Sequence, residues 1–241
     1  MLLIHIARMR VWTRTCRWYS TVNVVYEDNH LLVVNKPSGI LSQGDGTNRP
    51  NLLDWGKDYI KEKYCKPGKA YLGLVHRLDF SVSGLMVFGR TSKASSRLSK
   101  IFRQRDGSLV KEYLAVVAGS GLGELKATKT FREYAMEIDG RAAVTGLLPV
   151  SVGDDSALVR LRLITGRKHQ LRQLLAAMDL PIIGDDKYGS AEVLDGTSIA
   201  LHCNYLSFPH TTSMEQLSFH APLPLLWQNQ SWWSKICNDL E

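Results

Sequence analysis

The segment His76–Gly84, with the sequence His-Arg-Leu-Asp-Phe-Ser-Val-Ser-Gly, contains the residues of this chain best suited to chemistry. Asp79 lies two residues after Arg77 and just before a Ser-Val-Ser-Gly turn, and the apolar run Leu85–Phe88 predicts a buried strand. We therefore expect Asp79 on a loop at the mouth of a strand. A guanidinium group within about 4–6 Å would keep its carboxylate ionised, as a nucleophile or general base requires. An Arg-x-Asp pair is also common as a surface ion pair or Asx turn, so other motifs must decide.

A second group of charged residues lies at the start of a helix that we expect over residues 165–178. The helix is predicted by the 3.6-residue spacing of Leu171, Leu174, Leu175 and Met178, which gives it one buried stripe. Arg167, Lys168 and the free N–H groups of the first turn would converge on one end, which would form an anion site. Cations at this end oppose the helix dipole, so the pattern indicates an anion or carboxylate that faces them. Lys168 and Arg172 are four residues apart and would share a face.

These segments belong to an ordered series of motifs. The series consists of Lys36-Pro37-Ser38-Gly39, His76–Gly84, Lys111-Glu112-Tyr113 and the sequence Thr-Gly-Arg-Lys-His-Gln-Leu-Arg at 165–172. It resembles, in order and spacing, the motifs of the RluA-type pseudouridine synthases, and the resemblance extends from about Tyr26 to Pro224. Later matches are Pro181–Asp185, Tyr188-Gly189, Leu201-His202 and Ala221–Pro224. Each motif is weak by itself, whereas their ordered combination is highly specific.

The resemblance implies an enzyme that isomerises uridine to pseudouridine in RNA, without a cofactor or a metal. Such enzymes detach uracil from its ribose, rotate it and reattach it through carbon. Asp79 matches the catalytic aspartate, which either attacks the anomeric carbon or removes a ribose proton; the sequence leaves both open. Arg172 matches the arginine that pairs with this aspartate, and Tyr113 matches the aromatic residue that stacks on the flipped uracil. Without the resemblance, Tyr113 would be assigned to the core, because it lies in a β-rich run.

The remaining site residues are expected to hold the RNA. Arg77 matches the residue that fills the gap left when the base leaves the RNA stack. Lys36, Arg167 and Lys168 are candidates for phosphate contacts. The histidines are expected to be structural and to form hydrogen bonds: His76, His169, His202 and His220.

Three departures from the family pattern leave the chemistry intact. Val82 stands where the family has threonine, and Leu174 stands where it has histidine two residues after the paired arginine. Residues 178–180, Met-Asp-Leu, replace a more usual Leu-Gly-His. Because Asp79, Tyr113 and Arg172 are all present, we expect activity, and only fine positioning and substrate identity stay open.

The fold implied is α+β: a pseudouridine synthase domain with a mixed, largely antiparallel sheet, flanked by helices and loops, and a central active-site cleft. Besides the helix at 165–178, helices are predicted over 52–64 and 92–105. Strands are predicted over 22–26, 31–35, 85–88, 112–118, 126–137, 142–149 and 157–163. Trp227, Trp232 and Trp233 indicate either a C-terminal helix packed on the body or an exposed partner surface.

Composition is consistent with an RNA partner. The 241 residues carry a formal net charge of +7, the sign expected of a polyanion-binding protein. No run of 18 apolar residues occurs, so no membrane span is expected, and the four cysteines lack metal-binding spacing. A monomer is expected. One face of the helix at 92–105 carries five cations and no acid, and this face is either solvated or turned toward phosphates. These cations are Lys93, Arg97, Lys100, Arg103 and Arg105.

The first 26 residues differ from the rest of the chain. They contain four arginines and no carboxylate, which leaves a net charge of +3 for residues 27–241. Apolar and hydroxyl residues are interleaved with these arginines, as in a mitochondrial transit peptide. We expect residues 1–21 to direct the chain to the mitochondrial matrix, with cleavage after Tyr19, and residues 22–241 to form the catalytic domain. The alternative is a basic arm that touches RNA.

The first expectation for the substrate is large-subunit ribosomal RNA, and the second is transfer RNA. One rival function is a non-catalytic RNA-binding or ribosome assembly factor on the same scaffold, which would not need Asp79, Tyr113 and Arg172 together. Another is an aspartate-dependent hydrolase of nucleosides, which would not need the cationic helix at 92–105.

Overall fold

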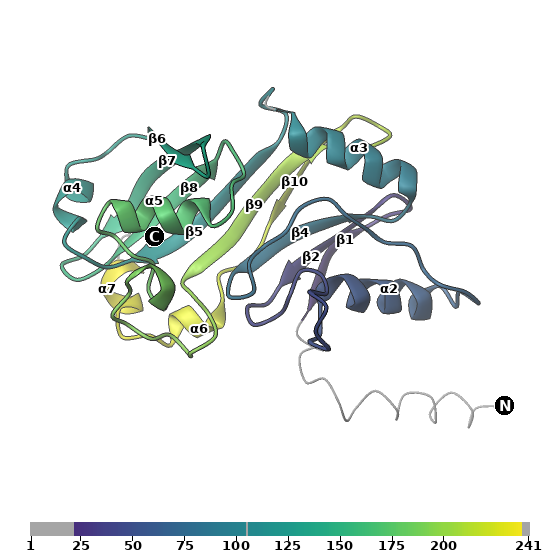
Figure 1. Ribbon diagram of the computed structural model, residues 1–241, viewed down its shortest axis with the longest axis horizontal. Helices are drawn as coiled ribbons and strands as arrows, with labels where there is room; N and C mark the ends of the chain where they lie inside the picture. The colour runs from purple at the N-terminus through teal and green to yellow at the C-terminus, as the bar shows by residue number, and fades with distance from the viewer. Residues whose placement is uncertain (1–21, 105, 238–241) are drawn as a thin grey trace.

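The computed structural model describes residues 22–104 and 106–237, so the expected transit peptide and Arg105 lie outside the described residues (Figure 1). The strands are β1 Asn23–Glu27, β2 Leu31–Lys36, β3 Gly73–Leu74, β4 Ser83–Gly89, β5 Val110–Val117, β6 Arg132–Ile138, β7 Arg141–Val152, β8 Ala157–Leu163, β9 Leu201–Pro209 and β10 Gln216–His220. The helices are α2 Leu52–Lys63, α3 Ser92–Arg103, α4 Leu122–Lys126, α5 Gln170–Ala177, η1 Asp186–Tyr188, α6 Leu225–Gln228 and α7 Trp233–Cys237.

All described strands form one sheet, in the order β1-β2-β4-β9-β5-β8-β7-β6, with β3 paired to β4 and β10 paired to β9. Strands β4 and β9 run parallel, with Ser83 opposite His202 and Gly84 opposite Cys203, whereas the other pairs of named strands are antiparallel. This mixed, largely antiparallel sheet confirms the predicted α+β class.

Gly84 makes the close approach of β4 to β9 possible. Its φ is +120°, and a Cβ at this position would lie 2.4 Å from the backbone of Cys203. Glycine alone fits both the backbone angle and the missing space. The turn before β4, which contains Asp79, is therefore joined directly to the middle of the sheet.

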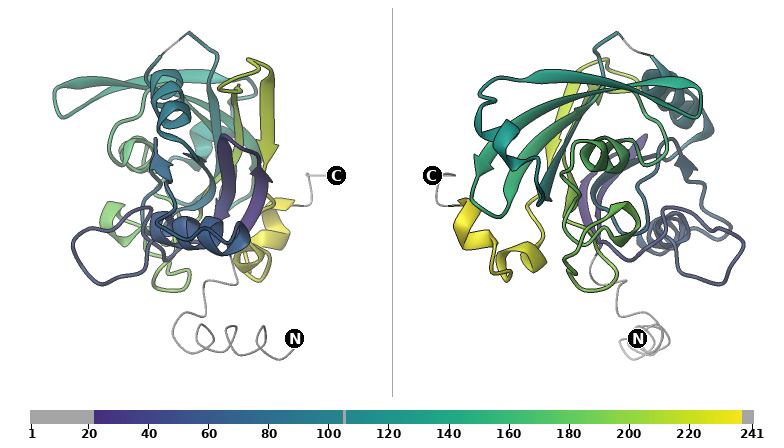
Figure 2. Two further views of the ribbon diagram at one scale, coloured as in Figure 1. Left: turned by 90° about the vertical axis from the view of Figure 1, so that its right-hand side faces the viewer. Right: turned by 60° about the vertical axis from the view of Figure 1, so that its left-hand side comes forward.

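Helices α3 and α5 lie on the same side of the sheet, as the views in Figures 1 and 2 show. The α3 helix begins after Thr91, whose hydroxyl accepts a hydrogen bond from the N–H of Ala94. It buries Ala94, Ser95, Leu98 and Ile101 and leaves its charged residues exposed. Among the described residues, no helix is long and apolar enough to cross a membrane.

Two predicted elements were wrong in their bounds. The strand expected over 126–137 begins only at Arg132, because Leu122 and Leu125 are buried on one side of the short helix α4. The helix expected from residue 165 begins at Gln170. Thr165 instead donates its hydroxyl hydrogen to the Gln170 side chain, and His169 has a φ of +53°, which no right-handed helix contains.

The C-terminal tryptophans confirm the packed alternative. Trp227 and Trp232 are buried, with ring centroids 6.4 Å apart, and Trp227 also meets the ring of His202 edge-on.

Strand β8, Ala157–Leu163, has the bounds that the alternating sequence predicts.

Candidate active site

Asp79 lies on a loop between β3 and β4 whose backbone is held on several sides. The Ser42 hydroxyl accepts a hydrogen bond from the N–H of Leu78 at 3.1 Å and donates to its carbonyl at 2.6 Å. The N–H of Gly39 donates to the carbonyl of Phe80 at 2.8 Å, and that of Ile199 to the carbonyl of Ser81 at 3.1 Å. These bonds fix the direction in which the Asp79 side chain leaves the loop. The turn after β2 thus acts as a support for the loop.

Lys36 belongs to this support and cannot make the predicted phosphate contact. Its side chain is fully buried, and its ammonium donates to the carbonyls of Pro37, Ile40 and Phe80 at 3.0, 2.9 and 3.4 Å. Burial lowers its pKa to about 7, against the opposing effect of the Asp79 charge. The predicted phosphate contact is not available because the short Lys-Pro-Ser-Gly turn folds back over the side chain. Lys36 therefore ties the turn to the Asp79 loop.

Arg172 connects Asp79 to a second carboxylate. Its Nη1 donates to Oδ2 of Asp79 at 3.2 Å, while Nε and Nη2 donate to the two carboxylate oxygens of Asp185, each at 2.6 Å. Asp185 is fully buried, whereas one third of the Asp79 side chain is exposed. Burial lowers the pKa of Arg172, but hydrogen bonds and charges from Asp185 and Asp79 outweigh it and raise the pKa above its usual value. The guanidinium is therefore a fixed positive charge beside an accessible carboxylate.

His169 also approaches the Asp79 carboxylate. Its Nε2 lies 3.5 Å from Oδ2 of Asp79, and its Nδ1 shares a hydrogen bond of 2.9 Å with the Tyr188 hydroxyl. The Tyr188 ring also lies 4.9 Å from the guanidinium carbon of Arg172. Burial is the main cause that lowers the pKa of His169; the Asp79 charge opposes it, and Arg172, Lys187 and Lys168 add to the lowering. His169 is thus part of the site, in contrast to the purely structural role expected for it.

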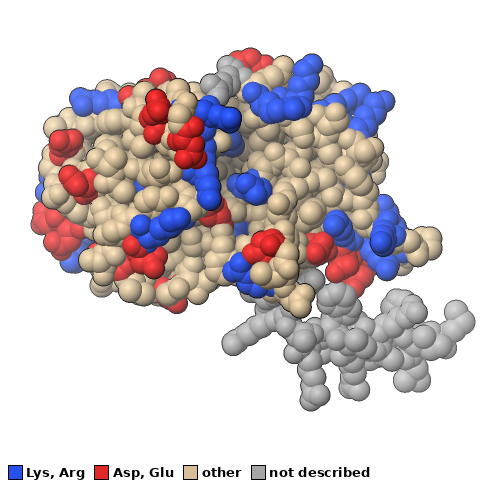
Figure 3. Space-filling view, viewed as in Figure 1, with Lys and Arg blue, Asp and Glu red and all other residues tan. Residues whose placement is uncertain are grey.

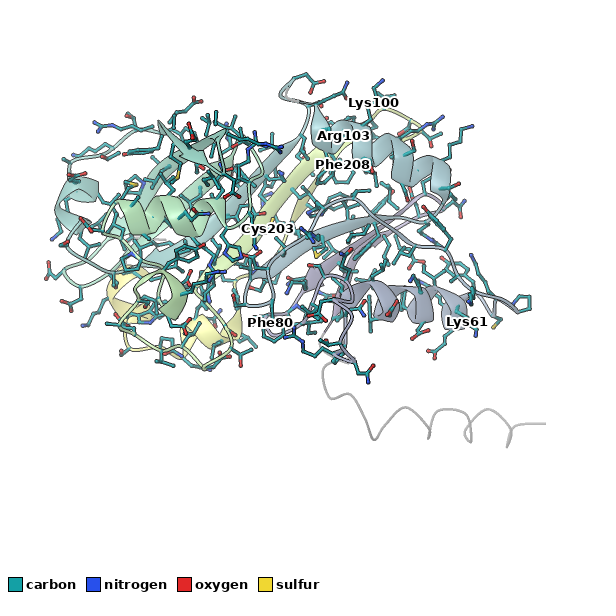
Figure 4. The ribbon with its side chains drawn as sticks, in the orientation of Figure 1. Lys61, Phe80, Lys100, Arg103, Cys203 and Phe208 are labelled. Atoms are coloured by element: carbon teal, nitrogen blue, oxygen red, sulfur yellow. The ribbon has the colours of Figure 1, made fainter. Side chains whose placement is uncertain are left out.

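Tyr113, in β5, is buried beside Cys203, which lies near the middle of the view in Figure 4. Burial, then the neighbouring Cys203 and the Asp79 charge, hold the pKa of Tyr113 well above its usual value, so its phenol stays protonated. Burial also raises the pKa of the Cys203 thiol to about 12. The effect of the Asp79 charge on Tyr113 indicates that the predicted aromatic residue lies near the predicted carboxylate. Tyr113 therefore belongs both to the core and to the site.

The three remaining predicted residues lie around this centre. Arg77 is exposed and makes no hydrogen bond or ion pair with another described residue. Lys168 is exposed, and Arg167 donates from Nε to the carbonyl of Ala142. Because α5 begins at Gln170, neither residue stands in its first turn, and the expected anion site at a helix N-terminus is not formed. Arg172 points inward and so does not share the outer face with Lys168.

The histidines outside the Asp79 contact behave largely as expected. His76 accepts a hydrogen bond from the N–H of Val87 and stacks on Phe102 at 4.6 Å between ring centroids. Burial, and then the charge of Lys111, lower its pKa to about 3. His202 is buried and shares a hydrogen bond with Ser83. Among the described residues, no group of three or more His, Cys, Asp or Glu side chains could hold a metal ion.

Asp185 and Tyr188 had no role assigned from the sequence. Both stand in family motifs, Pro181–Asp185 and Tyr188-Gly189, which gave the signal that they matter but not what they contact. Only the fold brings Asp185 to Arg172 and Tyr188 to His169. In Figure 3 the front surface is hollowed between the half that carries α5 and the half that carries α2 and α3.

Comparisons with known proteins identify the family of the chain. A family model described as RNA pseudouridylate synthase matches residues 30–177. The chain is 34% identical over 214 residues to a dual-specificity RNA pseudouridine synthase RluA of Haemophilus influenzae, over 83% of this chain and 92% of that protein. It is 32% identical over 224 residues to a ribosomal large subunit pseudouridine synthase D of Vibrio vulnificus, over 84% of this chain and 67% of that protein.

Among solved structures, the human RNA pseudouridylate synthase domain containing 4 superposes with a TM-score of 0.69 at 24% identity. The match covers 90% of this chain and 92% of the human chain. At this identity the likeness shows the fold alone.

Proposed function

The chain belongs to the RluA-type family of RNA pseudouridine synthases, and from that premise we propose that it converts one specific uridine of a structured RNA, with Asp79 as the catalytic carboxylate. The observation that carries the proposal is the pairing of an accessible Asp79 with a buried Arg172, itself held by Asp185. The guanidinium orients the Asp79 carboxylate through a hydrogen bond and leaves part of it open to a nucleotide. An ionised and accessible carboxylate can act on the sugar of a bound nucleotide, as a nucleophile or as a base.

The other groups have separate proposed roles. Tyr113 stacks on the flipped uracil and keeps its phenol proton, because its pKa is raised by burial. Arg77, exposed two residues before Asp79, fills the space that the uracil leaves in the RNA. The C1′–N1 bond breaks, the uracil turns, and C5 bonds to C1′ while the C5 proton leaves and N1 gains a proton. The product thus has the same atoms as the substrate, and the reaction needs no water.

Arg167 and Lys168 are proposed to contact phosphates beside the site. Both side chains are cationic, and Lys168 is exposed on the loop that leads to α5. Phosphate contacts of this kind hold the RNA in register without reading its sequence.

Large-subunit ribosomal RNA is the proposed substrate, with transfer RNA second. The Vibrio relative is named for the ribosomal large subunit, which supports the first choice. Mitochondrial targeting is proposed from the arginine-rich, acid-free residues 1–21 of the sequence. We propose that the protein acts as a monomer.

The test is pseudouridine mapping of mitochondrial ribosomal and transfer RNA in cells that lack the gene. The gene is restored as wild type, as Asp79→Ala or as Asp154→Asn, a control whose side chain is 97% exposed. We expect one site to vanish on deletion and to return with wild type and with the control, but not with Asp79→Ala.

Other outcomes have defined meanings. Full modification by Asp79→Ala would overturn the catalytic assignment. If no mitochondrial site changes, the targeting proposal fails and cytosolic RNA is mapped instead. If Asp79→Ala restores growth without restoring pseudouridine, the phenotype belongs to an RNA-binding factor.

A further inference from the structure

Helix α3 presents a basic face that the proposed catalytic site does not use. Lys93, Arg97, Lys100 and Arg103 are exposed on it, and none forms an ion pair with a carboxylate of the described residues. Figure 3 shows lysine and arginine side chains gathered over this helix. From Lys93 to Arg103 the helix rises about 15 Å, which makes the face an extended strip of positive charge.

A hollow at the N-terminal end of α3 extends this strip. The cavity has a volume of about 410 Å³, and its lining includes Lys93, Arg97 and Thr211. Nη1 of Arg97 donates to the carbonyl of Thr211 at 2.8 Å, so its guanidinium is held at the edge of the hollow. The hydroxyl of Thr211 is buried and has no hydrogen-bond partner among the described residues. The positive end of the helix dipole adds to the attraction for an anion here.

The opposite end of α3 touches the segment that leads to Asp79. Phe102 stacks on His76 at 4.6 Å between ring centroids, and His76 precedes Arg77 in the chain. The strip therefore begins beside the catalytic segment and continues away from it along the same side of the sheet as α5 (Figures 1 and 2). An RNA that places a uridine at Asp79 has a continuous positive surface for its adjoining stem.

We propose that the basic face of α3 and the hollow at its N-terminal end bind the phosphate backbone of the RNA stem that adjoins the target uridine. This inference rests on the proposed function, and it adds a second RNA contact outside the catalytic site. Four exposed cations without carboxylate partners match a polyanion, and they read no base sequence. The site would hold many RNA stems with similar affinity and would leave the choice of uridine to the catalytic site.

The test compares Lys93→Gln/Lys100→Gln with the control Lys61→Gln/Lys66→Gln, which removes the same charge. All four lysines are exposed. Figure 4 shows Lys100 and Lys61 at opposite edges of the molecule. Binding is measured by fluorescence anisotropy against salt concentration, with a long labelled RNA stem–loop and with a short oligouridine as probes.

We expect the α3 variant to bind the stem–loop roughly tenfold more weakly, with a salt slope shallower by about 1.5, because two phosphate contacts are lost. The control should follow the wild type. If both variants bind the stem–loop equally well, the α3 proposal fails, whereas the proposed function stands or falls with the Asp79 experiment. Failure of the wild type to bind the stem–loop would also overturn the α3 proposal.

Discussion

The buried pair of Arg172 and Asp185 should decide both stability and rate, and Asp185→Asn is the change that tests this. The two carboxylate oxygens of Asp185 each accept a hydrogen bond of 2.6 Å from the guanidinium, and the side chain is fully buried. Removing one partner of a buried ion pair leaves the other charge uncompensated, which costs about 3–5 kcal/mol. Asparagine keeps the shape but turns an NH₂ group toward guanidinium donors. We expect the free energy of unfolding to fall by about 3 kcal/mol.

The rate should fall as well. Without Asp185, Arg172 loses two of its three described hydrogen bonds, so it no longer holds Asp79 in one position. A displacement of about 1 Å in such a group costs on the order of 100-fold in rate. The measurements are urea unfolding followed by tryptophan fluorescence, and single-turnover pseudouridine formation under conditions where the variant is folded. The control is Asp186→Asn, at the neighbouring exposed carboxylate.

A double variant separates stability from catalysis. Arg172→Met/Asp185→Leu removes both buried charges, and such replacements are often neutral for stability or stabilising. We expect it to recover most of the lost free energy of unfolding but no activity, since Asp79 then has no cationic partner. The reasoning would be refuted if Asp185→Asn changed the free energy of unfolding by less than about 1 kcal/mol and left the rate unchanged.

Two further predictions concern the support and the aromatic residue of the site. Lys36→Met leaves three carbonyls without their donor and should lower the free energy of unfolding by about 1–3 kcal/mol. Because the Lys36 pKa is about 7 when folded and 10.5 ordinarily, the unfolded chain binds more protons between these values. The free energy of unfolding of the wild type should therefore rise with pH in this range, and that of Lys36→Met should not. If urea unfolding gave the two proteins equal pH slopes, the prediction would be contradicted. Tyr113→Phe should keep the RNA affinity of the wild type, whereas Tyr113→Ala should lose about 1–3 kcal/mol of binding free energy because the stacked ring is removed. Anisotropy titration measures both affinities, and equal values would contradict the stacking role.

Much of the fold follows from local patterns in the sequence. The alternation at 157–163 predicts β8, and the helical spacing of apolar residues within 92–105 predicts α3. The start of α5 could not be predicted in the same way. It depends on Thr165 and Gln170, whose side chains form hydrogen bonds with Val144 and Thr145 of β7, a strand that lies outside the segment itself.

The site shows the same division between local and distant causes. Asp79, Tyr113 and Arg172 could be named because they stand in recognisable motifs. The burial of Lys36 could not be predicted, because its environment is made partly by Phe80, 44 residues later. The same holds for Asp185, whose partner is settled by the fold and not by spacing. The charge of a lysine predicts that its side chain is exposed to solvent, and only the folded turn shows that Lys36 is buried.

The parallel pairing of β4 with β9 has a consequence for how the protein folds during its synthesis. The contact between Asp79 and Arg172 spans 93 residues, and the hydrogen bond between Ser83 and His202 spans 119. Contacts of such sequence separation form slowly, because a long loop must close before they add stability. A ribosome must therefore release the chain beyond β9 before the Asp79 loop reaches its final place. During most of its synthesis, the chain therefore carries Asp79 without its partners in the site. Activity begins only when synthesis is nearly complete.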